Sequence, residues 1–195
     1  MIKNETIRAL KVFLFFAFLT GIVYPLGITA IAQIIMPYQA NGSLIKENGK
    51  IVGSKLIGQN FDEPKYFHNR PSAVNYDAAG SGASNLAPSS KKLMNQVADR
   101  IKLVRVENNI PANKTIPSDM VLTSASGLDP HISIQNALLQ LPRVAKERNL
   151  PESKLKELIK KSTDHDFVGL WGQRGVNVLK LNLELDKNAG KQTKS

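Results

Sequence analysis

Residues 12–36 read VFLFFAFLTGIVYPLGITAIAQIIM, a run of 25 residues without a charged side chain. A helix rises about 1.5 Å per residue, so this run would measure roughly 37 Å, whereas the hydrocarbon core of a bilayer is about 30 Å thick. No later segment of the chain is comparably apolar. The run therefore predicts a transmembrane helix at 12–36, which places residues 37–195 on one side of the membrane.

A cleaved secretory signal peptide is the alternative interpretation of this run. Three basic residues, Lys3, Arg8 and Lys11, precede it, and the sequence AIA at 30–32 has the small-x-small pattern of a cleavage site. However, the run is longer than the roughly 7–15 apolar residues of a signal peptide, and it continues beyond that pattern through Met36. We therefore expect an anchor that is retained.

The charges before the run predict its orientation. Residues 1–11 carry three basic side chains against a single acidic one, Glu5, and the positive-inside rule keeps such a short basic segment in the cytoplasm. The protein is then expected in the cell membrane, inner or plasma, as a single-pass protein with a cytoplasmic N-terminus and an extracytoplasmic domain.

The composition of the run leaves its role open between a simple tether and a docking helix. Gly21 and Gly27 are small residues of the kind that allow close approach between helices in lipid. Tyr24, Pro25 and Gln33 carry polar or helix-disturbing groups that need partners in a bilayer. If the helix docks, Gly21 and Gly27 are the expected contacts with partner helices.

Charge and cysteine content exclude several classes of function for residues 37–195. These residues carry 23 basic and 15 acidic side chains, a net charge of +8. An exported domain meets no genome, so this charge fits anionic lipid head groups or an acidic partner better than nucleic acid. The chain has no cysteine, which excludes disulfides, thiol catalysis and cysteine-bound zinc.

The exported part, residues 37–186, is expected to form one α+β domain, because elements of both types occur without a βαβ order. A type I′ turn at Asn48-Gly49 predicts a hairpin within 43–59, and residues 61–88 have no helical period and predict a long loop. The remaining expectations are helices at 89–109, 133–148 and 151–163, a short strand at 120–123, a half-buried strand at 179–185 and a disordered basic tail at 187–195. Within the second helix we expect Ile134, Ala137, Leu138, Leu141, Val144 and Ala145 to face inward, with a kink or break at Pro142.

Two ATPase signatures are missing. The stretch GSKLIG at 53–58 has the glycine spacing of a phosphate-binding loop, but the lysine and hydroxyl that should follow are replaced by Gln59 and Asn60. The phosphate-acceptor sequence DKTG of ion pumps does not occur either. The chain is therefore not itself an ATP-hydrolysing unit.

Two loops, 66–89 and 117–133, are dense in Gly, Ser, Asn and Pro. The sequence SGASN at 81–85 is able to form an anion-binding nest of backbone N–H groups. The three histidines share no metal-ligand spacing, so we expect no metal site. Elaborate loops without catalytic residues favour a binding surface.

A membrane-anchored hydrolase is the alternative function. It would combine His131 with Asp119 or Asp129 and use Ser81 or Ser126 as the nucleophile. Neither loop contains the GxSxG sequence of a nucleophile elbow.

A series of motifs resembles the C subunit of the Kdp potassium-transporting ATPase, the KdpC family. The resemblance runs in order across nearly the whole chain, including the single N-terminal span. The motifs are GSKLIGQ (53–59), YFHNRPSA (66–73), SGASNLAPS (81–89), SGLDPHIS (126–133), QxxRVA (140–145) and VNVLKLN (176–182).

The resemblance implies an accessory, non-catalytic subunit of a high-affinity potassium uptake system. In that family a channel-like subunit binds potassium and a P-type subunit hydrolyses ATP, and the C subunit holds the two together. The family is also described as a catalytic chaperone that raises the ATP affinity of the hydrolysing subunit. That role implies ATP as a ligand, without a tightly bound cofactor, and Ser81, Gly82, Ser84 and Asn85 as its contacts.

Topology separates these two roles, because an outward-facing domain cannot reach ATP that is hydrolysed inside. Ala83, Ala87 and Ala125 also stand where the family usually has glycine, and alanine avoids the positive φ of a nest. We therefore favour the assembly role, in which Arg70, Asp129 and His131 contact the outer face of the potassium-binding subunit.

Overall fold

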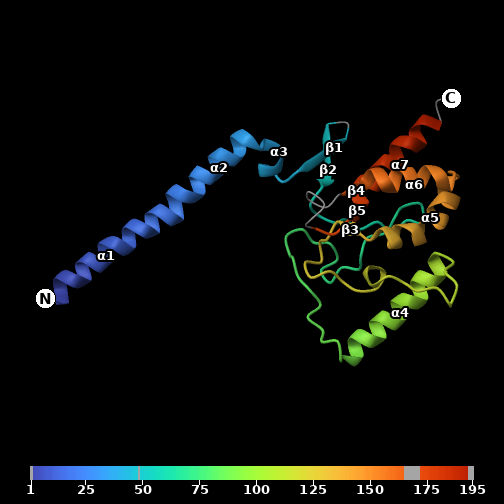
Figure 1. Cartoon of the computed structure of the whole chain (residues 1–195), viewed down its shortest axis with the longest axis horizontal. Helices are drawn as coiled ribbons and strands as arrows, with labels where there is room; N and C mark the ends of the chain where they lie inside the picture. Colours follow the sequence, from blue (N-terminus) through green and yellow to red (C-terminus); the bar gives the residue numbers. More distant parts are fainter. Residues whose placement is uncertain (1, 48, 165–171, 193–195) are drawn as a thin grey trace. The chain divides into compact units, whose positions relative to one another are not determined.

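The computed structural model describes residues 2–47, 49–164 and 172–192 and divides the chain into two compact units, 1–52 and 53–195. In the first unit, α1 (Ile2–Phe18), a π-helical turn (Leu19–Val23) and α2 (Tyr24–Ile35) follow one another as a single long helix, drawn in blue in Figure 1. Among the described residues, the part Asn4–Ile35 is the one helix long and apolar enough to cross a membrane, and none of it is buried within the chain. The predicted span is thus helical throughout 12–35.

A short helix and a hairpin follow. The helix is α3 (Pro37–Ala40), and β1 (Leu44–Glu47) pairs with β2 (Lys50–Ser54). Gly49 has a φ of +78°, as the predicted turn requires, whereas Asn48 lies outside the described residues. The hairpin is confirmed.

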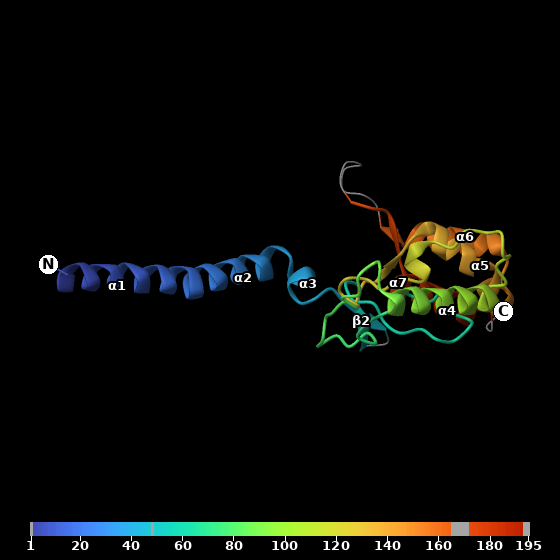
Figure 2. The same cartoon turned by 90° about the horizontal axis from the view of Figure 1, so that it is seen from below.

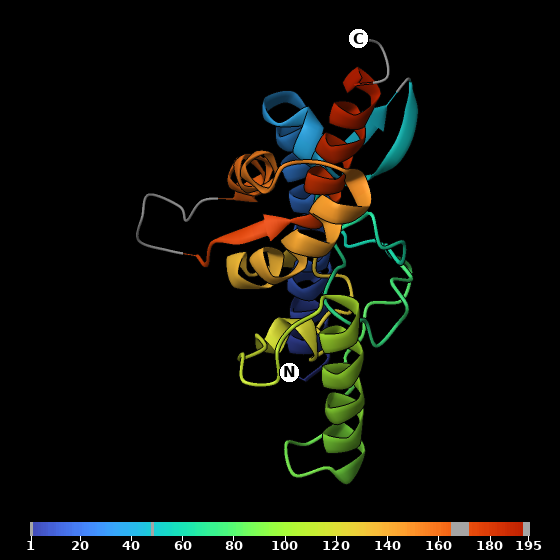
Figure 3. The ribbon, with the colours of Figure 1, turned by 90° about the vertical axis from the view of Figure 1, so that its right-hand side faces the viewer.

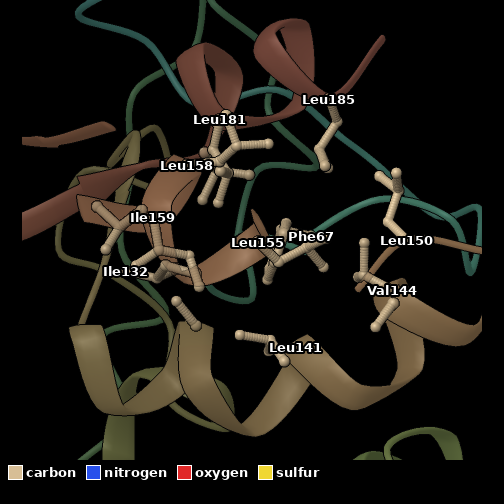
Figure 4. Packing of buried hydrophobic residues seen from close by; sticks show 14 residues of the cluster. Phe67, Ile132, Leu141, Val144, Leu150, Leu155, Leu158, Ile159, Leu181 and Leu185 are labelled. Carbon is tan, nitrogen blue, oxygen red and sulfur yellow. The ribbon is translucent and has the colours of Figure 1, made fainter. Parts of the chain in front are cut away.

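Three helices and a small sheet build the core of the second unit. They are α5 (Ile134–Arg148), α6 (Glu152–Ser162) and α7 (Val178–Gln192), with antiparallel strands β3 (His131–Ile132), β5 (Gly175–Asn177) and β4 (Thr163–Asp164) in the order β3-β5-β4. His131 lies opposite Asn177, and Thr163 lies opposite Val176. Figure 4 shows the apolar core between these elements, which consists mainly of Phe67, Ile132, Leu141, Val144, Leu155, Leu158, Ile159, Leu181 and Leu185.

A second, smaller cluster attaches α4 (Lys91–Glu107) to this core. Val97, Ile101 and Val104 of α4 pack on the buried side chains of Ile110, Met120, Val121 and Leu139. Within the unit, α5 lies between α4 and α7 (Figures 1 and 3). Figure 2 shows the unit from the side on which α4 lies. The predicted helices at 89–109, 133–148 and 151–163 are confirmed, and residues 61–88 form no helix or strand.

Local signals explain where α5 begins and ends. The Ser133 hydroxyl accepts a hydrogen bond from the Asn136 N–H, and Asn149 ends the helix in the left-handed region at a φ of 51°. Pro142 does not break the helix, which is continuous from Ile134 to Arg148. The prediction that residues of this helix face inward is wrong for two of them, because Ile134 and Leu138 are 38% and 44% exposed.

The strand predicted at 179–185 is wrong, and these residues form the first turns of α7. The alternation LKLNLEL favours a strand locally, but Val178, Leu181 and Leu185 recur at helical spacing and are fully buried. The helix continues to Gln192 and so includes the first part of the tail predicted at 187–195, whereas residues 193–195 lie outside the described residues. The strand expected at 120–123 is absent too, since residues 118–120 form a 3-10 turn (Ser118–Met120) and no strand follows it through residue 123.

Candidate partner-binding surface

Two buried carboxamide side chains hold the loop segment at residues 67–68 in place. The Phe67 N–H donates to Asn182 Oδ1 at 2.9 Å, and Asn182 Nδ2 donates to the Phe67 carbonyl at 2.9 Å. Gln140 binds His68 in the same way, at 2.7 Å from its N–H and 3.0 Å from its carbonyl. Each amide satisfies both main-chain groups of one residue, as a neighbouring strand would.

Arg143 extends this network from the next turn of α5. Its guanidinium donates to the carbonyls of Pro64 and Tyr66, to Asn108 Oδ1 at 2.9 Å and to Gln140 Oε1 at 2.8 Å. The motifs YFHNRPSA, QxxRVA and VNVLKLN, which are far apart in the sequence, therefore meet in one hydrogen-bonded network. This network makes the long loop rigid where it leaves the core.

A row of alternating charges lies next to this network. Arg70 Nη1 is 3.0 Å from Asp129 Oδ2, and Asp129 Oδ1 is 3.7 Å from His131 Nδ1. His131 Nε2 is 3.0 Å from Asp164 Oδ2, and Asp164 Oδ1 is 3.3 Å from Lys55 Nζ. We call these five residues the charged row. It joins four separate segments of the chain.

Neighbouring charges shift the pKa values of three groups in the charged row, His131, Asp129 and Asp164. The interaction with Asp129, followed by that with Asp164, raises the pKa of His131, although burial opposes the shift. Burial raises the pKa of both carboxyls, but His131 and the flanking Arg70 or Lys55 outweigh it, so the pKa of Asp129 and that of Asp164 lie below the usual value. The contacts therefore favour the charged form of all three groups.

The charged row borders an open cavity of about 570 Å³. Arg70, Asp129, His131 and Asp164 line it, and Arg174 and Asp119 add further charges. Asp119 is already occupied, because it accepts hydrogen bonds from the Ser133 N–H and hydroxyl and from Asn136 Nδ2. The lining is polar, preorganised and suited to hydrogen bonding with a protein surface.

The two predicted loops bind one another directly. The Gly82 N–H donates to the Ser126 carbonyl at 2.8 Å, the Ser81 hydroxyl donates to the same carbonyl at 3.1 Å, and the Ser72 hydroxyl donates to the Gly127 carbonyl at 2.7 Å. Gly127 has a φ of +69°, and a Cβ there would lie 2.8 Å from the Gly82 carbonyl oxygen. Close contact between the loops thus requires glycine at this position.

The structure brings some predicted site residues together and separates others. Arg70, Asp129 and His131 are neighbours in the charged row, as a common partner contact requires. Residues 81–85 lie against the second loop, and the cavities of about 570 and 460 Å³ are both lined by other residues. Gly21 and Gly27 lie in the long helix with open space around them.

In the part of the chain that the structure describes, the serine, histidine and aspartate of the hydrolase alternative are not arranged as a catalytic triad. Both ring nitrogens of His131 face carboxylates, at 3.7 Å and 3.0 Å. The Ser126 hydroxyl accepts from the Leu128 N–H and the Ser81 hydroxyl donates to a carbonyl, so neither is bound to a histidine. Across the same residues, no group of three metal-ligating side chains occurs; His165, one of the three histidines, lies outside them.

Sequence reasoning missed the roles of Asn182, Gln140 and Lys55, and the contact of Asp164 with His131. Asn182 and Gln140 each interrupt an apolar helix face, which is the signal that could have revealed them as buried hydrogen-bonding groups. Lys55 and Asp164 carry no comparable signal, because only the folded chain places them beside the loops.

Comparison with known proteins decides the family. A family model described as "K+-transporting ATPase, c chain" matches residues 6–187. The chain belongs to the KdpC family. Similar curated proteins are the potassium-transporting ATPase KdpC subunits of Mycobacterium tuberculosis strain H37Rv (48% identical over 187 residues, 95% of this chain and 99% of the relative), Caldanaerobacter subterraneus (47% over 191, 98% and 99%) and Bradyrhizobium diazoefficiens (45% over 202, 96% and 99%).

Membership in the KdpC family confirms the resemblance that the motifs indicated. The chain is an accessory, non-catalytic subunit of a potassium-transporting ATPase complex, and nothing supports the hydrolase alternative. As a subunit of a transport ATPase it is membrane-associated, and its long apolar helix is consistent with a membrane anchor.

Proposed function

We propose that this chain is the assembly subunit of the complex, which joins the potassium-binding, channel-like subunit to the P-type ATP-hydrolysing subunit. Its helix at 12–36 docks on their transmembrane helices, in part through Gly21 and Gly27. Its second unit contacts the outer face of the potassium-binding subunit with the loops that carry Arg70, Asp129 and His131.

One observation carries this proposal: the polar groups of the two loops bind one another and the core. Gly82, Ser81 and Ser72 are bonded to the second loop, and residues 67–68 are bonded to α5 and α7. Loops held in this way present a fixed surface and lose little entropy when a partner binds. The fixed loops support the binding of a partner protein more than they support a catalytic role.

The orientation in this proposal places the N-terminus in the cytoplasm and the second unit outside. The basic segment 1–11 supports it through the positive-inside rule. A single cysteine tests it, because the natural chain has none. Ser153→Cys, exposed on α6, should react with an impermeant maleimide on intact cells, whereas Asn4→Cys should react only after lysis. The reverse pattern would invert the topology.

Direct ATP contact at Ser81, Gly82, Ser84 and Asn85 does not enter the proposal. The N–H of Gly82 is already bonded to the Ser126 carbonyl, which removes one donor from a nest. The proposed orientation also puts this loop on the side opposite to ATP hydrolysis. Saturable binding in a titration of the full chain with ATP would restore the catalytic-chaperone role.

Co-purification tests the assembly role. The chain is expressed with the other subunits of its own operon and extracted in a mild detergent, and we expect the wild type to emerge in the complex. Arg70→Glu places two acidic groups in contact, the new carboxylate and that of Asp129, and should weaken association, whereas Lys92→Glu, at an exposed position of α4, should not. A wild-type chain that emerges alone would disprove the assembly role.

A further inference from the structure

The π-helical turn in the apolar helix leaves a backbone carbonyl without its partner. In the turn Leu19–Val23, the Tyr24 N–H donates to the Leu19 carbonyl, five residues back, rather than to that of Thr20. The next residue, Pro25, has no N–H. The Thr20 carbonyl therefore has neither the i+4 donor of an α-helix nor the i+5 donor of a π-helix.

The surroundings of this carbonyl are open. Gly21 has no side chain, and a Cβ built on it would meet nothing within 4 Å. The Thr20 hydroxyl donates to the Phe16 carbonyl at 2.7 Å, one turn toward the N-terminus. This hydroxyl therefore does not bind the Thr20 carbonyl. Residues of this turn are exposed throughout. A neighbouring helix has room to approach the backbone here.

Membrane physics makes an open carbonyl at this depth consequential. Residue 20 lies well inside the apolar run 12–36, where lipid tails offer no hydrogen-bond donor. An unpaired backbone group in hydrocarbon costs several kcal/mol, and proline in transmembrane helices is tolerated where neighbouring groups satisfy the freed carbonyl. The chain is a subunit of a potassium-transporting ATPase complex, which favours a transmembrane helix of a different subunit over a second copy as the source of a donor.

We propose that the turn Leu19–Val23 is a docking point for a transmembrane helix of another subunit, which directs a side-chain donor at the Thr20 carbonyl. The donor is a hydroxyl, carboxamide or indole N–H, and Gly21 allows the helix to come close. The inference rests on the proposed assembly role of the helix. It adds to that role the place and the chemistry of the contact.

Photochemical cross-linking identifies what covers the turn. A benzoylphenylalanine at Tyr24, one turn beyond Thr20, is activated in membranes that contain the intact complex. We expect an adduct on a transmembrane helix of a different subunit, with a hydroxyl, carboxamide or indole side chain within one turn of the adduct. Adducts with lipid only, with a second copy or with a helix that lacks such a side chain would each overturn the proposal.

Restoring the missing N–H tests the hydrogen bond itself. Pro25→Ala provides a donor within the chain, so the outside donor loses its acceptor. Hydrogen bonds between transmembrane helices contribute about 0.6–1.7 kcal/mol, so the complex should dissociate roughly 3- to 20-fold more readily in a detergent dilution series. Pro37→Ala is the matched control. Pro37 is the first residue of α3, so the N–H of an alanine at this position would have no helical acceptor.

Gly21→Leu provides a second variant that keeps Pro25 and blocks close approach. It should weaken the complex as well, even if Pro25→Ala alters insertion of the helix. If both variants associate as tightly as the wild type, the docking point is wrong while the assembly role stands. If the wild type itself does not associate, the assembly role fails instead.

Discussion

At the scale of residues, Asn182 and Gln140 determine how the long loop is attached to the helical core. Each carboxamide binds the N–H and the carbonyl of one loop residue, and both side chains are almost completely buried. A buried amide costs free energy unless its hydrogen bonds are made, so these bonds select one loop conformation. The partner-binding surface depends on that conformation.

We expect Asn182→Leu to lower the free energy of unfolding by about 2–5 kcal/mol, because the buried N–H and carbonyl of Phe67 would both lose their partner. Asn95→Leu, the same change at an exposed position of α4, should alter it by about 0.5 kcal/mol or less. Urea denaturation of the full chain in mild detergent measures both. Equal effects would show that the two hydrogen bonds contribute nothing.

His131 should make stability depend on pH in a defined direction. Its pKa is raised in the folded chain, so its contribution is complete below the unfolded value of 6.5 and is lost as the pH rises through the folded value. The side chain is 35% exposed, so screening limits the contribution to roughly 1 kcal/mol. The lowered pKa values of Asp129 and Asp164 affect stability at acidic pH. There the free energy of unfolding falls as the pH drops below the usual pKa of 3.8.

Denaturation of the wild type and of His131→Gln at several pH values from 5.5 to 8.5 isolates the histidine. The stability difference between the two chains should be largest at pH 5.5 and shrink as the pH rises. A difference that is constant across this range, or that grows with pH, would contradict the assignment.

At the scale of elements, α7 shows a local pattern overruled by packing. Strict alternation in LKLNLEL would place Leu179, Leu181, Leu183 and Leu185 on one face of a strand. In the helix, Leu181 and Leu185 are fully buried in the core and Leu183 is only partly buried. The helix also directs Asn182 at Phe67, which a strand with inward leucines would turn away.

Alanine substitution distinguishes the helix from the strand. Leu181→Ala and Leu185→Ala should each lower the free energy of unfolding by about 2–5 kcal/mol, the usual cost of a cavity in the core. Leu183→Ala should cost at least about 1 kcal/mol less, since less of its surface leaves water. Three equal losses would agree with the strand instead.

At the scale of the whole molecule, the buried apolar side chains that the structure describes belong to one unit. Both clusters, around α5–α7 and around α4, lie within 53–195, whereas the side chains of the long helix are exposed along almost its whole length. The long helix thus has the composition of a segment that lipid or other helices cover, and the second unit has its own core.

A fragment of residues 43–195 should therefore fold in water without the long helix. We expect a cooperative thermal transition whose midpoint agrees within a few degrees with that of the same domain in the full chain. Circular dichroism of the fragment and of the full chain in detergent makes the comparison. A fragment without a cooperative transition would mean that the helix contributes to the core.

Much of this architecture could be predicted, because the deciding signals are local. An apolar run, a capping serine before α5 and a glycine turn between β1 and β2 each act over a few residues. The motifs, which are also local, indicate the KdpC family. Of the site, the sequence indicated the two loops and three members of the charged row.

Local patterns in the chain establish the apolar helix and the membership in the KdpC family, and they exclude thiol and phosphate-loop chemistry. The folded chain is needed to show that LKLNLEL is helical, that Asn182 and Gln140 bind the loop, and that Lys55 and Asp164 complete the charged row. The physical reason is range. Hydrophobicity and turn chemistry act on neighbours in the chain, whereas burial and hydrogen bonding between residues about a hundred positions apart exist only after the chain has folded.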